Sequence, residues 1–325
     1  MREQSDITAS NSSGLELCYL PLHRSGELAE RVKRTRRHMQ DCDLCARYCH
    51  VNRLQTLRGV VCRTGERAVI HSFGPHHGDE SCLSGWNGSG TIFFSWCNLR
   101  CIFCQNREIR WKGIGEERSA EAFATTMLRL QDMGCHNINF VTPSHVVYQI
   151  LEAVEIAAAD RLRLPLVFNT GGYDSLEALQ LLDGVNDIYM PDMKYGDPAL
   201  AHRYSHVRDY VEYNRKAVKE MHRQVGDLVL GEDGLARRGL LVRHLVLPND
   251  IAGTGQVLKF LAKEISIDTY INTVDQYRPC YRAVEKPELD RTITSAEFEA
   301  ALETARRLGL SRLDRRFSRS WFPGL

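Results

Sequence analysis

The sequence predicts an α/β fold built on a parallel sheet, open or closed into a barrel, with a small cysteine-rich module in front of it. After Gly90, short apolar runs alternate with helix-like stretches, the pattern of repeated strand–helix–strand units with right-handed crossovers. Before Gly90, Cys, His and Gly are frequent and hydrophobic periodicity is not sustained. The 325 residues are 43% hydrophobic and 26% charged, the composition of a folded protein rather than a disordered or fibrous one.

Six apolar runs have the length of buried strands, and several are bounded by Gly, Pro or Asp. We expect these strands over residues 91–95, 137–142, 165–170, 187–192, 239–247 and 269–274. Apolar residues at three- and four-residue spacing predict helices between them, over residues 120–133, 144–159, 175–182 and 254–265. In parallel sheets of this kind the functional residues lie at the carboxyl ends of the strands.

Local signals predict three further elements. The stretch between the fourth and fifth strands is longer than one crossover helix, and residues 228–235 within it predict a small hairpin turning at Asp233-Gly234. Thr294 and Glu297 have capping-box spacing, so we expect the last helix to begin at Thr294 and end near residue 308. Five basic residues within 31–37 indicate a solvated helix face or, as the alternative, a docking surface for an acidic partner.

Charge and hydropathy exclude several classes of partner. The 42 basic and 41 acidic residues leave a net charge of +1, so the chain has no overall electrostatic attraction for nucleic acid or for an anionic membrane. No apolar run is long enough to span a membrane, and residues 1–13 lack the apolar region of a secretory signal. We therefore expect a cytoplasmic protein that acts on a small molecule or another protein.

The eleven cysteines are the most informative feature of the composition. An odd number in a reducing compartment argues against a disulfide framework, and closely spaced thiols there are usually metal ligands. The first cluster, Cys42, Cys45, Cys49 and Cys62, has the number of ligands for closed tetrahedral zinc, and an auxiliary iron–sulfur cluster that relays electrons is the alternative. The second, Cys97-x3-Cys101-x2-Cys104, has three, so it either recruits a distant ligand or leaves one metal position open for substrate or cofactor.

The second cluster resembles the signature of the radical S-adenosylmethionine (SAM) superfamily, in which an aromatic residue, here Phe103, precedes the third cysteine. A zinc knuckle is the alternative for the spacing alone. The surrounding sequence is similar to proteins related to pyruvate formate-lyase activating enzyme, over residues 88–106, 139–145, 168–174, 189–195, 242–249 and 276–279. This likeness extends from about Cys42 to Leu310.

The resemblance implies a partial (β/α)6 barrel in which Cys97, Cys101 and Cys104 hold a [4Fe-4S] cluster. The fourth iron would bind SAM, and one electron would cleave SAM to methionine and a 5′-deoxyadenosyl radical that abstracts hydrogen from a substrate C–H bond. A flavodoxin- or ferredoxin-type protein would supply the electron. On this basis we divide the chain into a polar, basic segment (1–40), a cysteine-rich metal-binding module (41–86), the radical SAM barrel (87–290) and a C-terminal helix and tail (291–325).

Other cofactor and substrate contacts are expected from positions on the strands. Asp192 and Lys194 match the family's Asp-x-Lys, and alternation along a strand puts both side chains on one face. Arg243 on the fifth strand is suited to bind the methionine carboxylate or a substrate. We expect Asp192 and Lys194 to lie over the cofactor or substrate as catalytic residues. Cofactor contacts are expected at these two residues, at Arg243, and at Phe103, Asn106, Thr142, Ser144, Asn169 and Thr170, with structural ion pairs or caps as the alternative.

One departure from the family pattern concerns the methionine amino group. Most members carry Gly-Gly-Glu at the end of the second strand, where this chain has Val141-Thr-Pro-Ser-His145. Thr142, Ser144 and His145 are the candidates to replace its hydrogen bonds, and Ser144 would alternatively cap the following helix.

Cys280, just past the last strand, is a candidate hydrogen-atom donor. A thiol that returns hydrogen to the opposite face of a substrate radical inverts a stereocentre, so we favour small-molecule modification, for example of a sugar, by epimerisation. A buried cysteine without a role is the alternative for Cys280. The alternative functions are activation of a glycyl-radical enzyme and a non-catalytic iron–sulfur electron carrier.

Overall fold

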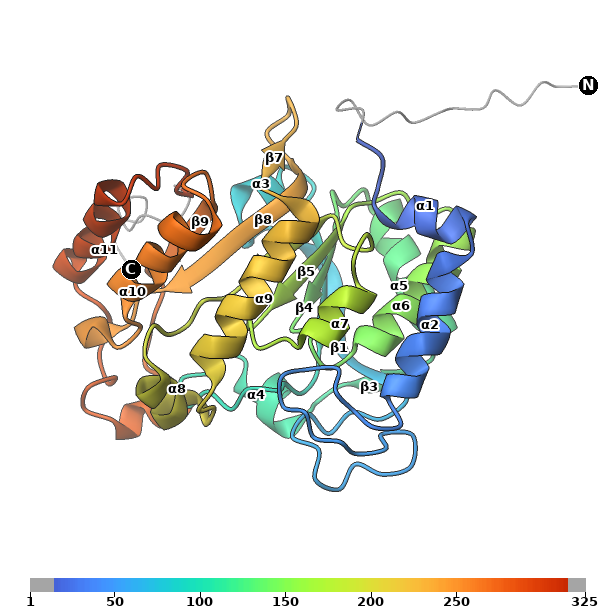
Figure 1. The fold of residues 1–325 in the computed structure, drawn as a ribbon, viewed down its shortest axis with the longest axis horizontal. Coiled ribbons are helices and arrows are strands. Elements are labelled where there is room, and N and C mark those ends of the chain that lie inside the picture. The colour runs from blue at the N-terminus through green and yellow to red at the C-terminus, as the bar shows by residue number, and fades with distance from the viewer. Residues whose placement is uncertain (1–14, 315–325) are drawn as a thin grey trace, which may run out of the picture.

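The computed structural model describes residues 15–314, and its centre is a sheet of six parallel strands (Figure 1). In spatial order these are β2 (Ser89–Phe94), β4 (Ile138–Val141), β5 (Leu166–Thr170), β6 (Ile188–Pro191), β8 (Ala236–Leu245) and β9 (Tyr270–Val274). All six overlap the strands expected from the sequence. The other edge of β2 is occupied by β1, so the sheet is open, and the α/β class with a partial barrel is confirmed.

Two antiparallel strands extend this sheet beyond β2, and the sequence pattern did not reveal them. β1 (Ala68–His76) pairs with β2, and β3 (Glu116–Arg118) pairs with β1. In β1 the alternation of buried and exposed residues holds only at the start, and the pairing register shifts between Ile70 and Ser72. An irregular strand rich in His, Gly and Pro lacks the period-two pattern on which strand prediction depends. β1 lies within the range 41–86.

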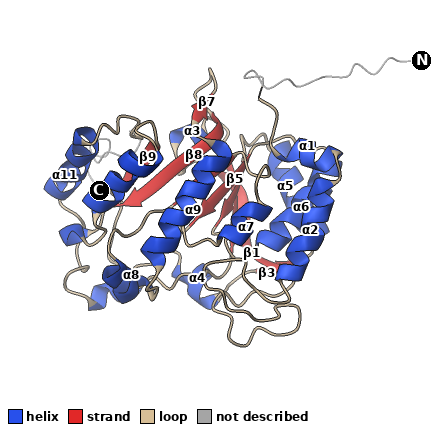
Figure 2. Cartoon of the chain, in the orientation of Figure 1, coloured by secondary structure: helices blue, strands red, loops and turns tan. Residues whose placement is uncertain are grey.

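Helices cover the outer face of the parallel sheet (Figure 2). The expected crossover helices are α5 (Ala120–Asp132), α6 (Val147–Ala159), α7 (Leu176–Leu181), and α10 (Thr254–Phe260) with its π-turn extension Leu261–Ile265. The last helix, α11 (Ser295–Arg307), has the predicted capping box between Thr294 and Glu297. The long connection after β6 contains α8 (Pro198–Ser205), α9 (Tyr210–Val225) and β7 (Val229–Leu230), and β7 forms the predicted hairpin with the start of β8.

The N-terminal part of the described chain packs outside this layer. α1 (Tyr19–Arg24) and α2 (Glu27–His38) lie against α6. In α2, Arg31 and Arg34 pair with Glu27, and Lys33 pairs with Glu30. Lys33 and Arg34 are exposed, whereas Arg31 is largely buried and also donates to the Leu181 and Asp183 carbonyls, so only part of the basic run is a solvated helix face.

The remaining short elements lie at the two ends of the strands. α3 (Ser81–Ser84) directly precedes β2 and therefore lies at the amino ends of the parallel strands, whereas α4 (Arg107–Lys112) follows the β2 loop at their carboxyl ends. The short turns of helix at Pro248–Asp250 and Tyr281–Glu285 follow β8 and β9. Residues 41–67 contain no helix or strand and lie beside α4, on the side of the carboxyl ends (Figure 1).

Candidate active site

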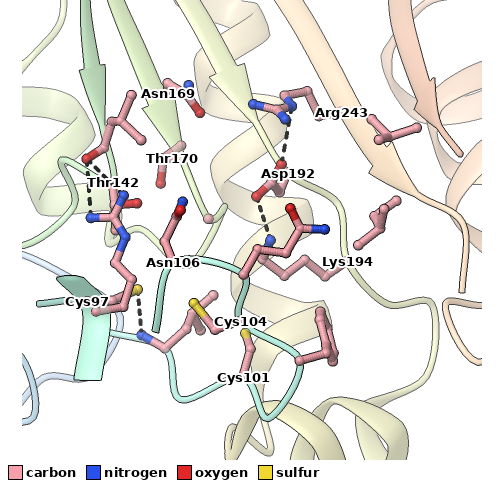
Figure 3. Close-up of a pocket in the computed structure, with 18 of the residues that line it drawn as sticks. Cys97, Cys101, Cys104, Asn106, Thr142, Asn169, Thr170, Asp192, Lys194 and Arg243 are labelled. Atoms are coloured by element: carbon pink, nitrogen blue, oxygen red, sulfur yellow. Dashed lines mark hydrogen bonds and ion pairs between the residues drawn. The ribbon is translucent and has the colours of Figure 1, made fainter. Parts of the chain in front are cut away.

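A cavity of about 240 Å³ lies at the carboxyl ends of the parallel strands (Figure 3). Each of the six strands, or the loop that follows it, contributes to its lining. The polar and sulfur-bearing lining residues are Cys97, Cys101, Cys104, Gln105, Asn106, Arg110, Thr142, Asn169, Thr170, Asp192, Lys194, Arg243 and Gln276. Its position is the one expected for the active site of a barrel of parallel strands.

The loop after β2 brings the three cysteines of the second cluster to this cavity (Figure 3). The backbone N–H of Leu99 donates to Cys97 Sγ at 3.3 Å, and the Ser205 hydroxyl donates to Cys101 Sγ at 2.9 Å. Burial, together with the two neighbouring thiols, raises the pKa of Cys104 to about 12. Ligation of iron by these thiols is therefore coupled to release of protons.

Asp192 and Lys194 line the cavity from the end of β6, on one face of the strand as alternation predicts. Lys194 Nζ lies 2.5 Å from Asp192 Oδ2, and Arg243 Nε lies 3.8 Å from Asp192 Oδ1. Although burial opposes the charge of Lys194, Asp192 raises its pKa, so the ammonium form is retained. The carboxylate of Asp192 is thus held between two cations at the cavity wall.

Arg243 has a second carboxylate partner that sequence reasoning missed. Glu80, at the start of α3, is 1% exposed and places Oε1 3.4 Å from Arg243 Nε. Asn272 on β9 donates to the same oxygen at 2.7 Å. Glu80 reaches Arg243 from the amino ends of the strands, through the interior of the barrel, and no local sequence signal indicates this contact.

Asn169 and Thr170 at the end of β5 also line the cavity, as expected. The Thr170 hydroxyl lies 2.8 Å from Ser144 Oγ and 2.7 Å from the Asp174 carboxylate. Burial raises the pKa of Asp174 to about 6. Ser144 is 1% exposed and does not line the cavity, and because α6 begins at Val147 it does not cap that helix either. It belongs to a buried hydrogen-bonded group behind the cavity wall.

The segment that replaces Gly-Gly-Glu has one residue in the cavity and one behind it. Thr142 lines the cavity with a φ of 63°, and its N–H donates to the Asn169 carbonyl at 2.8 Å. His145 does not line the cavity, since its Nε2 lies 2.9 Å from the Ser95 carbonyl. A carbonyl only accepts, so Nε2 carries the proton. Burial, reinforced by Arg53, lowers the pKa of His145 to about 3 and keeps the ring neutral.

Arg110 on α4 is a cavity residue that the sequence analysis did not single out. It is 5% exposed, and its guanidinium donates to the backbone carbonyls of Phe94, Trp96 and Val141. Within residues 15–314 it has no carboxylate at ion-pair distance. Its sequence signal is weak, because Arg107 and Lys112 are also basic and lie on the same short helix.

Of the three remaining predicted site residues, Phe103 and Asn106 line the cavity and Cys280 does not. The Cys280 thiol donates to the carbonyl of Phe103 at 3.1 Å. The Phe103 side chain lines the cavity and packs edge-on against the rings of Tyr195 and Tyr277. Phe103 thus lies between Cys280 and the cavity.

Comparisons with known proteins agree with this arrangement. The sequence profile of the Radical SAM superfamily matches residues 91–232, which include the three cavity cysteines and strands β2 to β7. The chain is also 30% identical over 289 residues to "Uncharacterized protein MJ0674" of Methanocaldococcus jannaschii, covering 86% of this chain and 78% of that protein. The chain belongs to the radical SAM superfamily.

Three solved structures match part of the chain at low sequence identity. HydG, a maturase of the [FeFe]-hydrogenase, is matched with a TM-score of 0.47 and 13% identity over 67% of this chain and 48% of HydG. A radical SAM methyltransferase from Sphaerobacter thermophilus gives 0.46 and 13%, over 70% of this chain and 66% of that one. Methylornithine synthase (PylB) gives 0.46 and 16%, over 69% and 62%. The chain spans between about half and two thirds of the length of these proteins.

Membership of the radical SAM superfamily implies a [4Fe-4S] cluster and SAM, and the cavity residues fit both. Three thiols converge in one cavity, which suits a four-iron cube with one iron left without a protein ligand. The buried guanidinium of Arg110, hydrogen-bonded to backbone carbonyls within the described residues, offers a charge for an anionic group in the same cavity.

No helix in the described part of the chain is long and apolar enough to cross a membrane.

The first cysteine cluster lies in the segment 41–67, around the buried Arg53. Arg53 Nη1 lies 3.5 Å from Cys42 Sγ, and a hydrogen bond from Cys49, helped by Arg53, lowers the pKa of Cys42 to about 5. Cys45 and Cys62 are buried in the same segment. Among residues 15–314, however, no group of three or more Cys, His, Asp or Glu is arranged to hold a single metal ion. Zinc or an auxiliary cluster at these four cysteines therefore stays a prediction.

Proposed function

We propose that this radical SAM protein cleaves SAM reductively at a cluster held by Cys97, Cys101 and Cys104, and abstracts hydrogen from a C–H bond of a small molecule. The observation that carries this proposal is the shared cavity: the three thiols face polar side chains from the ends of the other parallel strands. When bound, the cluster and SAM supply a 5′-deoxyadenosyl radical. The protein's own contribution is binding, orientation and exclusion of water.

Arg110 is the residue that we assign to the methionine carboxylate of SAM. Arg243, the candidate from sequence, already has Glu80 and Asp192 as counter-charges. Within residues 15–314 the guanidinium of Arg110 hydrogen-bonds to carbonyl oxygens and has no carboxylate at ion-pair distance, so a carboxylate in the cavity would complete its charge pairing. Thr142, at the cavity wall, is the better candidate for the amino group, since Ser144 and His145 are turned to other partners.

The Arg110 assignment is tested by SAM binding to the anaerobically reconstituted protein. Arg110→Gln should weaken SAM binding by roughly tenfold to a hundredfold, the range of a hydrogen bond to a charged group. Arg107→Gln on the same helix is the matched control, because Arg107 is exposed and pairs with Glu108. Circular dichroism shows whether Arg110→Gln folds, and Arg110→Lys should restore part of the affinity. Unchanged SAM affinity in a folded Arg110→Gln protein would refute the assignment.

The cluster proposal is tested by iron content, electron paramagnetic resonance and product analysis. Dithionite-reduced wild-type protein should convert SAM to 5′-deoxyadenosine. Cys101→Ala should lose about four iron atoms per chain together with that activity. Cys135→Ala, a buried cysteine outside the cavity, should keep both. Iron-replete wild-type protein that cannot cleave SAM would overturn the proposal and favour an electron carrier.

For the reaction itself we propose epimerisation with Cys280 as the hydrogen-atom donor. The substrate C–H bond would break toward the 5′-deoxyadenosyl radical, and the S–H bond would then break to form the new C–H bond, leaving a thiyl radical that one electron and one proton return to the thiol. Since the thiol now donates to the Phe103 carbonyl, this role requires its rotation into the cavity.

Deuterium labelling tests the Cys280 role. In D₂O the epimer should carry one deuterium, and Cys280→Ala should still form 5′-deoxyadenosine while losing the epimer. Epimer formation by Cys280→Ala would refute this step but leave SAM cleavage untouched. An oxygen-sensitive glycyl radical on a partner protein would instead support the activase alternative.

A further inference from the structure

A second hollow, of about 400 Å³, lies behind the cluster loop and is not used by the proposed reaction. Its polar lining consists of Arg47, Arg63, Arg100 and His206, and its apolar part is formed by Leu57, Gly59, Val60 and Val61 of the cysteine-rich segment. Leu99 and Cys101 line the main cavity, whereas Arg100 between them lines this hollow. One short loop thus separates the two spaces.

The hollow concentrates positive charge without a counter-charge. No acidic residue lines it, and within the described chain none of its three arginines has a carboxylate at ion-pair distance. Instead the guanidinium groups lie over aromatic rings: Arg63 over Trp96 at 5.2 Å, Arg100 over Trp111 at 5.0 Å and Arg47 over Tyr173 at 5.6 Å. Arg47 Nη2 is buried without a hydrogen-bond partner.

Like charges held this close repel one another. Arg47, Arg63 and Arg100 all line this one hollow of about 400 Å³. An anionic partner would relieve this repulsion and would be attracted from a distance. In a chain with a net charge of only +1, such a group of arginines is a local feature and not a consequence of overall composition.

The hollow also lies close to both cysteine clusters. Arg100 stands in sequence between Cys97 and Cys101, and its guanidinium donates to the carbonyl of Val61, next to Cys62. Trp111, which stacks with Arg100, lines the main cavity as well. A partner seated here would therefore approach the cluster loop from the side that SAM and substrate do not occupy.

We propose that this hollow docks an acidic one-electron carrier protein of the flavodoxin or ferredoxin class, which reduces the cluster through the loop 97–104. The inference rests on the proposed function, because reductive SAM cleavage consumes one electron. The carrier loses that electron and the cluster gains it, from the 2+ to the 1+ state, with no proton transferred. Exposed Leu57 and Arg63 form part of the rim, a combination of apolar and Arg side chains that is common in protein interfaces.

Charge reversal at Arg63 tests the proposal on the reconstituted protein. Arg63 is exposed and makes no ion pair within the described residues, so Arg63→Glu removes little of the folded structure. Arg129 is exposed on α5 and lies outside the hollow, so Arg129→Glu changes the net charge equally and is the matched control. The probe is a reduced flavodoxin, with its affinity measured by titration calorimetry at low and high salt, and cluster reduction followed by absorbance and electron paramagnetic resonance.

Arg63→Glu should weaken flavodoxin binding at low salt by about tenfold and slow cluster reduction by flavodoxin to a similar extent, and high salt should narrow the difference. Arg63→Glu should keep wild-type levels of cluster reduction by dithionite, of the cluster signal and of dithionite-driven SAM cleavage. Arg129→Glu should match wild type in every measurement.

Three outcomes would overturn the docking site. The first is an unchanged flavodoxin affinity in Arg63→Glu, and the second is an equal loss of flavodoxin affinity in Arg129→Glu. The third is that Arg63→Glu slows cluster reduction by dithionite as much as reduction by flavodoxin, which would mean that the arginines act on the cluster itself. Tight binding of inorganic phosphate to the hollow without competition against flavodoxin would likewise replace this proposal by a small-anion site. Failure of dithionite to drive SAM cleavage would count against the proposed function and not against the binding result.

Discussion

His145 makes the stability of this protein sensitive to acid in a way that can be calculated. The ring is fully buried, and its Nδ1 has no hydrogen-bond partner while Nε2 donates to the Ser95 carbonyl. Burial and Arg53 lower its pKa from 6.5 to about 3. Because the folded-state pKa lies below the unfolded one, the unfolded chain binds the proton first. The stability contributed by the neutral ring is complete above pH 6.5 and is lost as the pH falls toward 3.

Between pH 7 and pH 5 the loss due to His145 is about 2 kcal/mol. Two buried carboxyl groups act in the opposite direction, because burial raises the pKa of Asp174 and of Asp187 to about 6. Each of them destabilises the fold as the pH rises from about 4 to 6, so the pH dependence of the wild-type protein alone does not isolate the effect of His145. A comparison with a variant at position 145 separates the histidine from the two carboxyls.

His145→Gln is the informative variant, since its amide N–H can still donate to the Ser95 carbonyl and it does not titrate. We expect it to be less stable than wild type at pH 7, and this difference should shrink by about 2 kcal/mol at pH 5. Urea unfolding of the apo-protein, followed by tryptophan fluorescence at both pH values, measures the change. A stability difference that is the same at pH 5 and pH 7, within about 0.5 kcal/mol, would refute the assignment of a neutral, acid-sensitive His145.

Three further predictions concern residues that bond to or pack against the backbone around the site. Arg53→Gln should lower the free energy of unfolding by about 3 kcal/mol in urea titrations, because it leaves two buried carbonyl groups without their charged donor; a loss below about 1 kcal/mol would contradict this role. Tyr210→Phe should cost about 1–2 kcal/mol in the same assay, since the lost hydroxyl donates to two carbonyls, including that of Asp192 at 3.0 Å. Gly172→Ala should prevent stable folding, judged by soluble yield and thermal melting, because its φ is 74° and a Cβ would lie 2.2 Å from the Asp192 carbonyl oxygen. Gly226→Ala, with a φ of 69° and open space around the Cβ, should lose only about 1 kcal/mol, and equal losses at both glycines would show that backbone strain and not the clash matters.

Regular local patterns in the sequence predicted most of the fold. The six parallel strands, the helices α5, α6, α7 and α10 and the Thr294 capping box have signals within ten to twenty residues and were predicted, whereas α8 and α9 were not. β1 was missed because its contacts, not its own periodicity, make it a strand: it is held by pairing with β2 on one side and β3 on the other.

The candidate site likewise contains residues that a local motif predicts and residues that are recognised only from their contacts in the fold. Cys97, Cys101 and Cys104 are a motif of eight residues, and Asp192 and Lys194 a motif of three, so their convergence on one cavity follows from where the strands end. Arg110 and Glu80 have no such motif. Ser144 and Cys280 have plausible positions in sequence, but their side chains bond to Thr170 and to the Phe103 carbonyl and do not line the cavity.

The sequence by itself determined the fold class, the three cavity thiols and the strand ends on which the other cofactor candidates lie, because each depends on spacing along the chain. Only the tertiary structure decided which cations are already neutralised. Arg243 meets Glu80 through the barrel interior, while Arg110 hydrogen-bonds to carbonyl groups and has no carboxylate at ion-pair distance among residues 15–314. The structure also gathers Arg47, Arg63 and Arg100 from two separate segments into one unpaired group behind the cluster loop. Charge pairing depends on distance in space, which a sequence of near-equal acidic and basic content does not reveal.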